Sequence, residues 1–330
     1  MLKYCKSTLL MSKNKMFGFG YTYRCAILMV FFFQFVYTYK PVVLVRGIFS
    51  DGDELNDLKN LIIQSHPNTN VTVLKYLSDL ETLENLSFQL RIFNNKMKRF
   101  IKKYKDGFHI ICHSQGTLLV FTTSGLLCLG LLESVTKHNI ETFVALSTPI
   151  FGQYGLPKVI LRRIPVLRPI ANLTRELLSP FIYRSFLQKF VSIANYWKDP
   201  RLEFQEDFET HVRYLTKVTN DPNSKWFDKT EAAVRKQNFL KLKKLVLIGG
   251  PDDGVIIPWQ SSLFGYYGSD SQSKSVVEMT QQKMFLEDWF GLKSLYNRGG
   301  VSSYVFADVK HNDWHGNKTV FHKAIEPWLT

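Results

Sequence analysis

The sequence predicts an α/β fold in which a mostly parallel sheet is covered by helices on both faces. Short apolar runs alternate with helical patterns over the first 150 residues. One of these runs leads directly into the sharp turn His113-Ser114-Gln115-Gly116 and then into a helix-like stretch. The same alternation resumes at Lys244 after a long interruption. Continuous apolar strands separated by helices are typical of a parallel sheet that is buried on both faces.

The elements are expected in the following order along the chain. The first part contains four strands and three helices: strands at Pro41–Val45, Val71–Tyr76, Phe108–Cys112 and Thr142–Leu146, and helices at Asp53–Ser65, Leu86–Tyr104 and Thr117–Leu129. The last part is expected to contain a strand at Lys244–Gly249, a helical stretch at Gln281–Tyr296, a strand at Ser303–Ala307 and a helix at Thr319–Trp328.

Between these parts, residues 151–242 lack the alternation of strands and helices. Prolines interrupt the segment, and Phe204, Phe208, Val212 and Leu215 have the spacing of one helix face. We therefore expect a core at 40–150 and 243–330, with 151–242 as a helical insertion. Before them, residues 1–39 combine a basic stretch with the apolar run Ala26–Val36, which is too short to span a bilayer comfortably. This pattern favours a signal peptide, with a retained signal anchor as the alternative.

The charge is strongly positive, at +14. Five basic residues lie before residue 40, where there is no acid, which leaves 37 basic against 28 acidic residues and a charge of +9. This excess favours contact with anionic partners such as a membrane surface, although a basic surface without a specific partner fits equally well. Four Asn-x-Ser/Thr sequons agree with secretion and make Asn70, Asn85, Asn172 and Asn317 candidate glycosylation sites.

Only two cysteines follow the expected leader, Cys112 and Cys128. Cys112 ends the strand before the sharp turn, and Cys128 lies near the end of the helix expected after it. Their separation along the chain predicts a distance of roughly 20 Å, at about 1.5 Å per helical residue. Because a disulfide needs Cα atoms within about 7 Å, we expect two free thiols.

The turn at Ser114 is the strongest indication of chemistry. A strand, a sharp turn and a helix form a nucleophile elbow, which exposes a serine hydroxyl above the edge of the sheet. Gly116 fits the usual Gly-x-Ser-x-Gly pattern, and Cys112 replaces the first glycine. Backbone amides of Gln115, at the helix start, and of Ile48, in the loop after the first strand, are candidates for an oxyanion hole. Arg46 stands in that loop where histidine is common.

A serine nucleophile needs a base and a carboxylate. Asp252 and Asp253 both follow the strand Lys244–Gly249, so either could be the acid, although local turn hydrogen bonds would also explain them. His311 and His315 both lie in the loop after the last strand, where the base is expected. With Asp313 between them they also suggest a metal site, but no third ligand has a clear spacing, and we favour no metal.

Several stretches resemble the palmitoyl-protein thioesterases, particularly the lysosomal branch called palmitoyl-protein thioesterase two. The resemblance runs from about Tyr39 to the C-terminus. Its most specific segments are Tyr39-Lys-Pro-Val-Val, Cys112-His-Ser-Gln-Gly, Asn195-Tyr-Trp-Lys-Asp-Pro, Leu247-Ile-Gly-Gly-Pro-Asp-Asp-Gly-Val-Ile-Ile-Pro-Trp-Gln-Ser-Ser and Ile325-Glu-Pro-Trp-Leu.

The resemblance implies an α/β-hydrolase with a helical cap at 151–242 that cuts fatty-acyl thioesters in the lysosome. It matches Ser114, Asp253 and His311 to the catalytic triad of that family. It implies an acyl-CoA-like or S-palmitoyl substrate, no cofactor and no nucleic acid, and it leaves the oligomeric state open. The alternatives are an oxygen-ester lipase with the same triad and an inactive acyl-lipid-binding glycoprotein.

Overall fold

The computed structural model describes residues 39–45, 54–74, 84–113, 124–155, 162, 165–269 and 275–330. The expected leader lies outside these residues except for Tyr39. In the described part, no helix is long and apolar enough to cross a bilayer.

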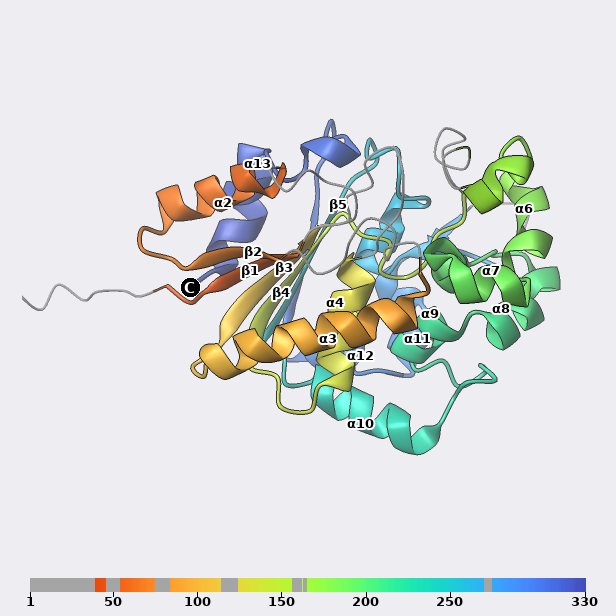
Figure 1. The fold of residues 1–330 in the computed structure, drawn as a ribbon, viewed down its shortest axis with the longest axis horizontal. Coiled ribbons are helices and arrows are strands. Elements are labelled where there is room, and N and C mark those ends of the chain that lie inside the picture. The colour runs from red at the N-terminus through yellow and green to blue at the C-terminus, as the bar shows by residue number, and fades with distance from the viewer. Residues whose placement is uncertain are drawn as a thin grey trace, which may run out of the picture. The chain divides into compact units, whose positions relative to one another are not determined.

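A six-stranded parallel sheet forms the centre of the fold, in the order β2-β1-β3-β4-β5-β8 (Figure 1). The strands are β1 (Val42–Val45), β2 (Val71–Leu74), β3 (Phe108–His113), β4 (Ile140–Leu146), β5 (Lys244–Gly249) and β8 (Val301–Val305). A small antiparallel pair, β6 (Tyr266–Tyr267) and β7 (Val276–Val277), lies outside this sheet. The α/β fold predicted from the alternating pattern is confirmed.

Both faces of the sheet are covered, as continuous apolar strands require. Alternate side chains of each strand point to opposite faces, so Ile110 enters one hydrophobic cluster and Ile111 the other. On the first face pack α3 (Leu86–Lys103), α4 (Ser124–Ser134) and α10 (Lys229–Phe239). The second face carries α2 (Glu54–Ser65) and the C-terminal helical turns, as Figure 1 shows.

The C-terminal elements are more broken than their apolar spacing predicted. The stretch expected as one helix at Gln281–Tyr296 divides into α11 (Lys283–Leu286) and α12 (Leu292–Asn297), because Asp288 and Gly291 adopt positive φ between them. This break lets Phe290 enter the core. The last helix begins as α13 (Lys318–Val320) and continues as a π-helical turn at Phe321–Ile325 and a 3₁₀ turn at Glu326–Trp328.

The expectation of two free thiols is wrong, because Cys112 and Cys128 form a disulfide with Cα atoms 6.7 Å apart. The predicted distance between the two cysteines assumed that the chain continues in one direction after the turn at Ser114. Since β4 pairs parallel with β3, however, α4 must run back from the carboxyl edge of the sheet to the amino edge. That return brings Cys128 beside Cys112. Gly125 of the same helix packs against Thr148, where a Cβ atom would be 1.9 Å from the threonine hydroxyl oxygen.

The described part of 151–242 is helical and lies between β4 and β5. Its α-helices are α6 (Arg175–Ile182), α7 (Ser185–Phe190), α8 (Gln205–His211), α9 (Arg213–Val218) and α10. Its 3₁₀ turns are at Pro165–Ile170, Ser192–Tyr196 and Leu202–Phe204, and further 3₁₀ turns follow at Trp259–Leu263, Met279–Gln281 and His311–Asp313. The apolar face expected from Phe204 to Leu215 spans both α8 and α9, which meet at buried Val212. Within the expected insertion at 151–242, the part from residue 162 to Val218 is called the cap from here on.

Candidate active site

Three neighbouring strands, β4, β5 and β8, end at the same edge of the sheet, and the loops after them meet there. The Phe306 N–H donates to Gly249 O at 3.1 Å, and His311 N–H donates to Asp253 O at 3.0 Å. Gly250 is required for this approach, since a Cβ atom there would lie 1.9 Å from the carbonyl oxygen of Phe306. The backbone therefore holds the loop of Asp253 against the loop of His311.

Within this contact, Asp253 and His311 form a buried pair. The Nδ1 atom of His311 lies 2.8 Å from Oδ2 and 3.0 Å from Oδ1 of Asp253. The exposed fractions of the two residues are only 4% and 3%. Because Nδ1 faces a carboxylate, the hydrogen bond assigns the proton to Nδ1 and leaves the lone pair on Nε2. Among the described residues, Nε2 has no hydrogen-bond partner.

Four further donors hold the carboxylate of Asp253. The Ser147 hydroxyl donates to Oδ2 at 2.5 Å and the Trp314 indole N–H to the same oxygen at 2.8 Å. The backbone N–H groups of Val255 and Ile256 donate to Oδ1 at 3.0 and 2.8 Å. With His311, these bonds restrain the carboxylate in position and orientation.

The same contacts also determine the protonation state of the Asp253 carboxyl. Burial alone would raise the pKa of the Asp253 carboxyl above its ordinary value of 3.8. The electrostatic interaction with His311 and the hydrogen bonds from His311, Ser147 and the Ile256 N–H outweigh burial and lower this pKa to about 2. The carboxylate therefore stays ionised in mildly acidic surroundings.

The alternative acid and base lie differently. Asp252 is exposed and accepts a hydrogen bond from the Asp308 N–H at 2.8 Å, which is a local loop contact. His315 is half-buried, and its ring packs edge-on against the ring of His113 instead of a carboxylate. Burial lowers the pKa of His315. In the described part of the chain, no group of histidine, cysteine or acidic side chains is arranged to hold a metal ion.

His113, the last residue of β3, connects this pair to the elbow. It is fully buried, and its ring stacks on that of His311 with centroids 5.8 Å apart. Burial, followed by the charges of His311 and His315, holds the pKa of His113 well below its ordinary range, so its imidazole is neutral. Ser114 is the next residue in the chain. Ser114, Gln115 and Ile48 themselves lie outside the described residues.

Two residues of this arrangement, Ser147 and Trp314, were not predicted. Ser147 directly follows β4 and adopts a positive φ of 45°, and its N–H donates to Ile248 O. The signal that could have found it is a hydroxyl at the carboxyl end of the strand next to β5. Trp314 lies three residues after His311, and only the fold shows that its indole N–H returns to Asp253.

The four sequon asparagines lie in different surroundings. Asn70 and Asn172 are exposed, whereas Asn317 caps α13 through a hydrogen bond from the Val320 N–H. Asn85 is half-buried, and both ends of its amide are engaged. Its Oδ1 accepts from the Phe88 N–H at 3.0 Å, and its Nδ2 donates to Lys189 O at 2.9 Å.

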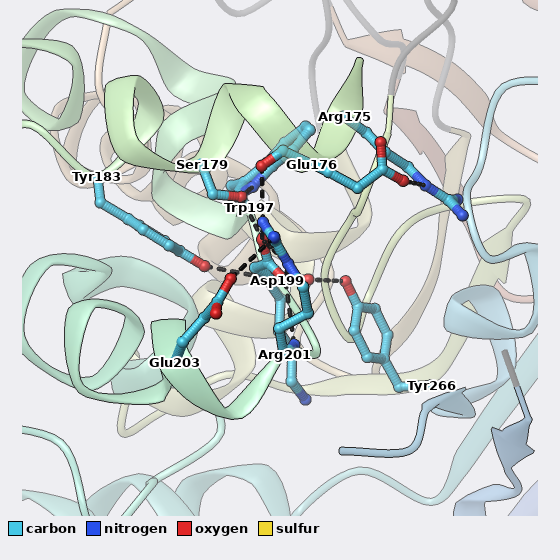
Figure 2. Close-up of polar contacts among 10 residues, drawn as sticks. Arg175, Glu176, Ser179, Tyr183, Trp197, Asp199, Arg201, Glu203 and Tyr266 are labelled. Carbon is cyan, nitrogen blue, oxygen red and sulfur yellow. Dashed lines mark hydrogen bonds and ion pairs between the residues drawn. The ribbon is translucent and has the colours of Figure 1, made fainter. Parts of the chain in front are cut away.

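A second buried carboxylate, Asp199, lies in the cap, and Figure 2 shows its surroundings. Arg201 binds it through two nitrogens, at 2.7 Å to Oδ2 and 3.1 Å to Oδ1. The Ser179 hydroxyl donates to Oδ2 at 2.5 Å, and the Trp197 indole N–H donates to Ser179 Oγ at 3.0 Å. These bonds join α6 to the chain at 197–201.

The sheet order, the crossover helices and the buried acid–histidine pair at the carboxyl edge define an α/β-hydrolase. The sequence model described as palmitoyl protein thioesterase matches residues 41–311. The chain therefore belongs to the palmitoyl protein thioesterase family.

Relatives from three animals cover most of the chain. It is 39% identical to the lysosomal thioesterase PPT2-B of Xenopus laevis over 297 residues, covering 89% of this chain and 93% of that one. Identity to the human lysosomal thioesterase PPT2 is 38% over 293 residues, with 89% of both chains covered. Identity to the Drosophila melanogaster lysosomal thioesterase PPT2 homolog is 30% over 291 residues, covering 88% of this chain and 92% of that one.

Proposed function

We propose that this protein hydrolyses long-chain fatty-acyl thioesters, of the acyl-CoA or S-palmitoyl type, with Ser114, His311 and Asp253 as its triad. The observation that carries the proposal is the buried Asp253–His311 pair. Its Nε2 has no hydrogen-bond partner among the described residues, and the ring stacks on His113, the residue before Ser114. Membership of the thioesterase family supports the same chemistry. The lysosomal names of the relatives support a lysosomal location reached through the secretory pathway.

In the first half-reaction, Ser114 Oγ attacks the thioester carbonyl carbon while His311 Nε2 accepts the hydroxyl proton. Asp253 keeps the other nitrogen protonated and stabilises the imidazolium that forms. The amides of Ile48 and Gln115 stabilise the oxyanion, each donor contributing about 3 kcal/mol to lowering the barrier. The carbon–sulfur bond then breaks, and the thiolate takes the proton from His311.

In the second half-reaction, water replaces the thiol. His311 accepts a proton from the water as it attacks the acyl-enzyme, and returns that proton to Ser114 Oγ as the fatty acid leaves. The carboxylate of Asp253 supports both halves in mild acid because its pKa lies near 2. This chemistry uses no metal and no cofactor.

Turnover of palmitoyl-CoA, measured beside a palmitoyl oxygen ester, tests the proposal. Wild type is expected to favour the thioester, and Ser114→Ala is expected to abolish turnover while the protein keeps its unfolding temperature. Preference for the oxygen ester would indicate a lipase. Binding of the acyl chain without turnover of either ester would indicate an acyl-lipid-binding protein.

A further inference from the structure

The outer sides of α6 and α7 expose large apolar side chains. Leu177 is 55% exposed, Phe186 59% and Phe190 51%. The rings of Phe186 and Phe190, one helical turn apart on α7, pack on each other with centroids 5.1 Å apart. Apolar side chains gathered on one surface are characteristic of a site that meets another surface or a membrane.

The opposite sides of α6 and α7 pack against the rest of the protein. Leu178 and Ile182 of α6 and Leu187 of α7 are buried. Ser179 also points inward, where its hydroxyl donates to the buried carboxylate of Asp199 (Figure 2). The two helices cannot turn their exposed rings inward without breaking these contacts, so the rings stay exposed.

The chain segment that carries this surface is also basic. Residues 162–190 contain six lysines and arginines and a single acid, Glu176. Glu176 is already paired with Arg175 at 3.0 Å. The exposed Arg184 lies over the ring of Phe181, which places a cation directly beside the apolar side chains. We call this surface, formed by Leu177, Phe181, Arg184, Phe186, Lys189 and Phe190, the cap face.

A cavity of about 390 Å³ adjoins the cap face. Lys189 belongs to both, and Ser185 and Gln188 of α7 also line the cavity. Two further cationic side chains line this cavity, Arg213 and Lys225. Trp226 closes one wall, with Arg213 4.9 Å from its ring centroid. The described residues that line the cavity include no carboxylate. Its charge and size suit a phosphate-bearing headgroup.

We propose that the cap face docks on an anionic phospholipid bilayer, with a lipid headgroup phosphate in the adjoining basic cavity. Apolar rings beside lysine and arginine are the combination that binds at the interface of an anionic membrane. This inference rests on the proposed function, since it would bring the enzyme to acyl thioesters that are anchored in a membrane. Figure 1 shows α6 and α7 grouped with α8, away from the sheet.

Flotation with vesicles tests the docking without relying on turnover. The Ser114→Ala protein, secreted by eukaryotic cells with its glycans kept, is mixed with phosphatidylcholine vesicles with or without 30% phosphatidylglycerol. We expect binding to the anionic vesicles at least about ten-fold stronger, and weaker at 0.5 M than at 0.1 M NaCl because salt screens surface charges. Equal binding to both vesicles, or no binding to either, overturns the proposal.

Matched variants locate the docking surface. Phe186→Ser with Phe190→Ser is expected to lower vesicle binding about ten-fold, and Leu177→Ser to lower it several-fold. Leu286→Ser is the control, because Leu286 is also 55% exposed but lies on α11, and it is expected to bind as wild type does. Equal losses in Leu177→Ser and Leu286→Ser would show that exposed leucine in general, and not the cap face, governs the binding.

The cavity has its own variants. Arg213→Gln with Lys225→Gln is expected to reduce the preference for anionic vesicles about ten-fold. The control, Lys102→Gln with Lys103→Gln, removes the same charge at the far end of α3, roughly 25 Å from Asn85 at about 1.5 Å per residue. If the control loses as much of its preference for anionic vesicles as the cavity variant, overall charge explains the effect and the headgroup site is overturned.

Glycopeptide mapping provides a separate test, because Asn85 lines the cavity. A glycan on Asn85 would occupy the space assigned to the headgroup, so the proposal requires this sequon to be unmodified. Turnover of a soluble short-chain acyl-CoA by these variants in the wild-type background separates the two proposals. Vesicle binding without any turnover would reject the thioesterase, and normal soluble turnover without vesicle binding would reject the docking.

Discussion

Two buried carboxylates of this protein, Asp253 in the core and Asp199 in the cap, have nearly the same surroundings. Each accepts a serine hydroxyl at 2.5 Å, and in each case a tryptophan N–H supports the arrangement. The difference lies in the cation. Asp199 holds Arg201, whose guanidinium does not release a proton in proteins, whereas Asp253 holds His311.

This difference separates a structural site from a site equipped for catalysis. The guanidinium of Arg201 is fully engaged, since its nitrogens also bind Glu176 O and Glu203 Oε1. The imidazole of His311 keeps Nε2 unpaired among the described residues. Both carboxylates have numerous polar contacts, so the number of contacts does not separate them. The histidine partner, whose Nε2 has no hydrogen-bond partner among the described residues, supports instead the proposal that Asp253 is the acid of the triad.

The largest effect expected from this comparison is on catalysis. Asp253→Asn should lower kcat about 10⁴-fold, because the amide no longer favours the correct tautomer of His311 or stabilises its imidazolium. Steady-state turnover of palmitoyl-CoA measures it. Asp252→Asn is the matched control and should stay within a few-fold of wild type, since Asp252 is exposed. A reversed ranking of the two variants would reject the pairing of Asp253 with His311.

The cap carboxylate should behave in the opposite way. Asp199→Asn removes the more buried of the two carboxylates that pair with Arg201 among the described residues, and should cost about 2 kcal/mol of unfolding free energy. This is less than for a fully buried pair, because Arg201 is partly exposed and keeps Glu203. Turnover of a soluble short-chain acyl-CoA should stay within a few-fold of wild type. Urea unfolding and steady-state kinetics on the same preparation measure both quantities. A 10³-fold loss of kcat in a stably folded variant would contradict the structural assignment.

The ionisation of Asp253 predicts a pH dependence of stability. Its pKa is about 2 in the folded protein against an ordinary 3.8, so its contribution is fully present above about pH 4 and is lost as the pH falls toward 2. Relative to Asp253→Asn, wild type should therefore lose about 2 kcal/mol of unfolding free energy over this range. Denaturant melts at several pH values measure the difference. A constant gap between the two proteins would show that the pKa of Asp253 is not lowered.

A smaller effect is expected from the hydroxyl that holds Asp253. Ser147→Ala should lower kcat about ten-fold with little change in KM, because the carboxylate loses one donor and orients His311 less well. Thr148→Val is the control, since the neighbouring Thr148 hydroxyl has no hydrogen-bond partner among the described residues. Equal kinetics for Ser147→Ala and wild type would exclude a positioning role for Ser147.

The parts of the fold that local patterns determine could be predicted from the sequence. The apolar runs at Val42–Val45 and Lys244–Gly249 form strands that are buried in the sheet. Such a run can be recognised from its own residues, without knowledge of distant segments. Asp253 was found by its place after a late strand, with the family resemblance choosing it over Asp252. His311 was chosen over His315 in the same way.

Contacts between distant segments could not be predicted. Ser147 and Asp253 are 106 residues apart in sequence, and their hydrogen bond exists only because β4 and β5 are neighbours in the sheet. The disulfide between Cys112 and Cys128 was missed for a related reason, since the return of α4 along β3 cannot be deduced from residue counts. The break at Asp288 depends on the burial of Phe290, which only tertiary packing shows.

The central claim, that His311 paired with Asp253 is the base for Ser114, is tested most directly by covalent labelling. Wild type, His311→Ala and His315→Ala are treated with a fluorophosphonate probe, and peptide mass spectrometry locates and quantifies the label. Label is expected on Ser114 in wild type and, within a few-fold of the same rate, in His315→Ala, but not in His311→Ala. Normal labelling of His311→Ala together with loss of label in His315→Ala would contradict the account.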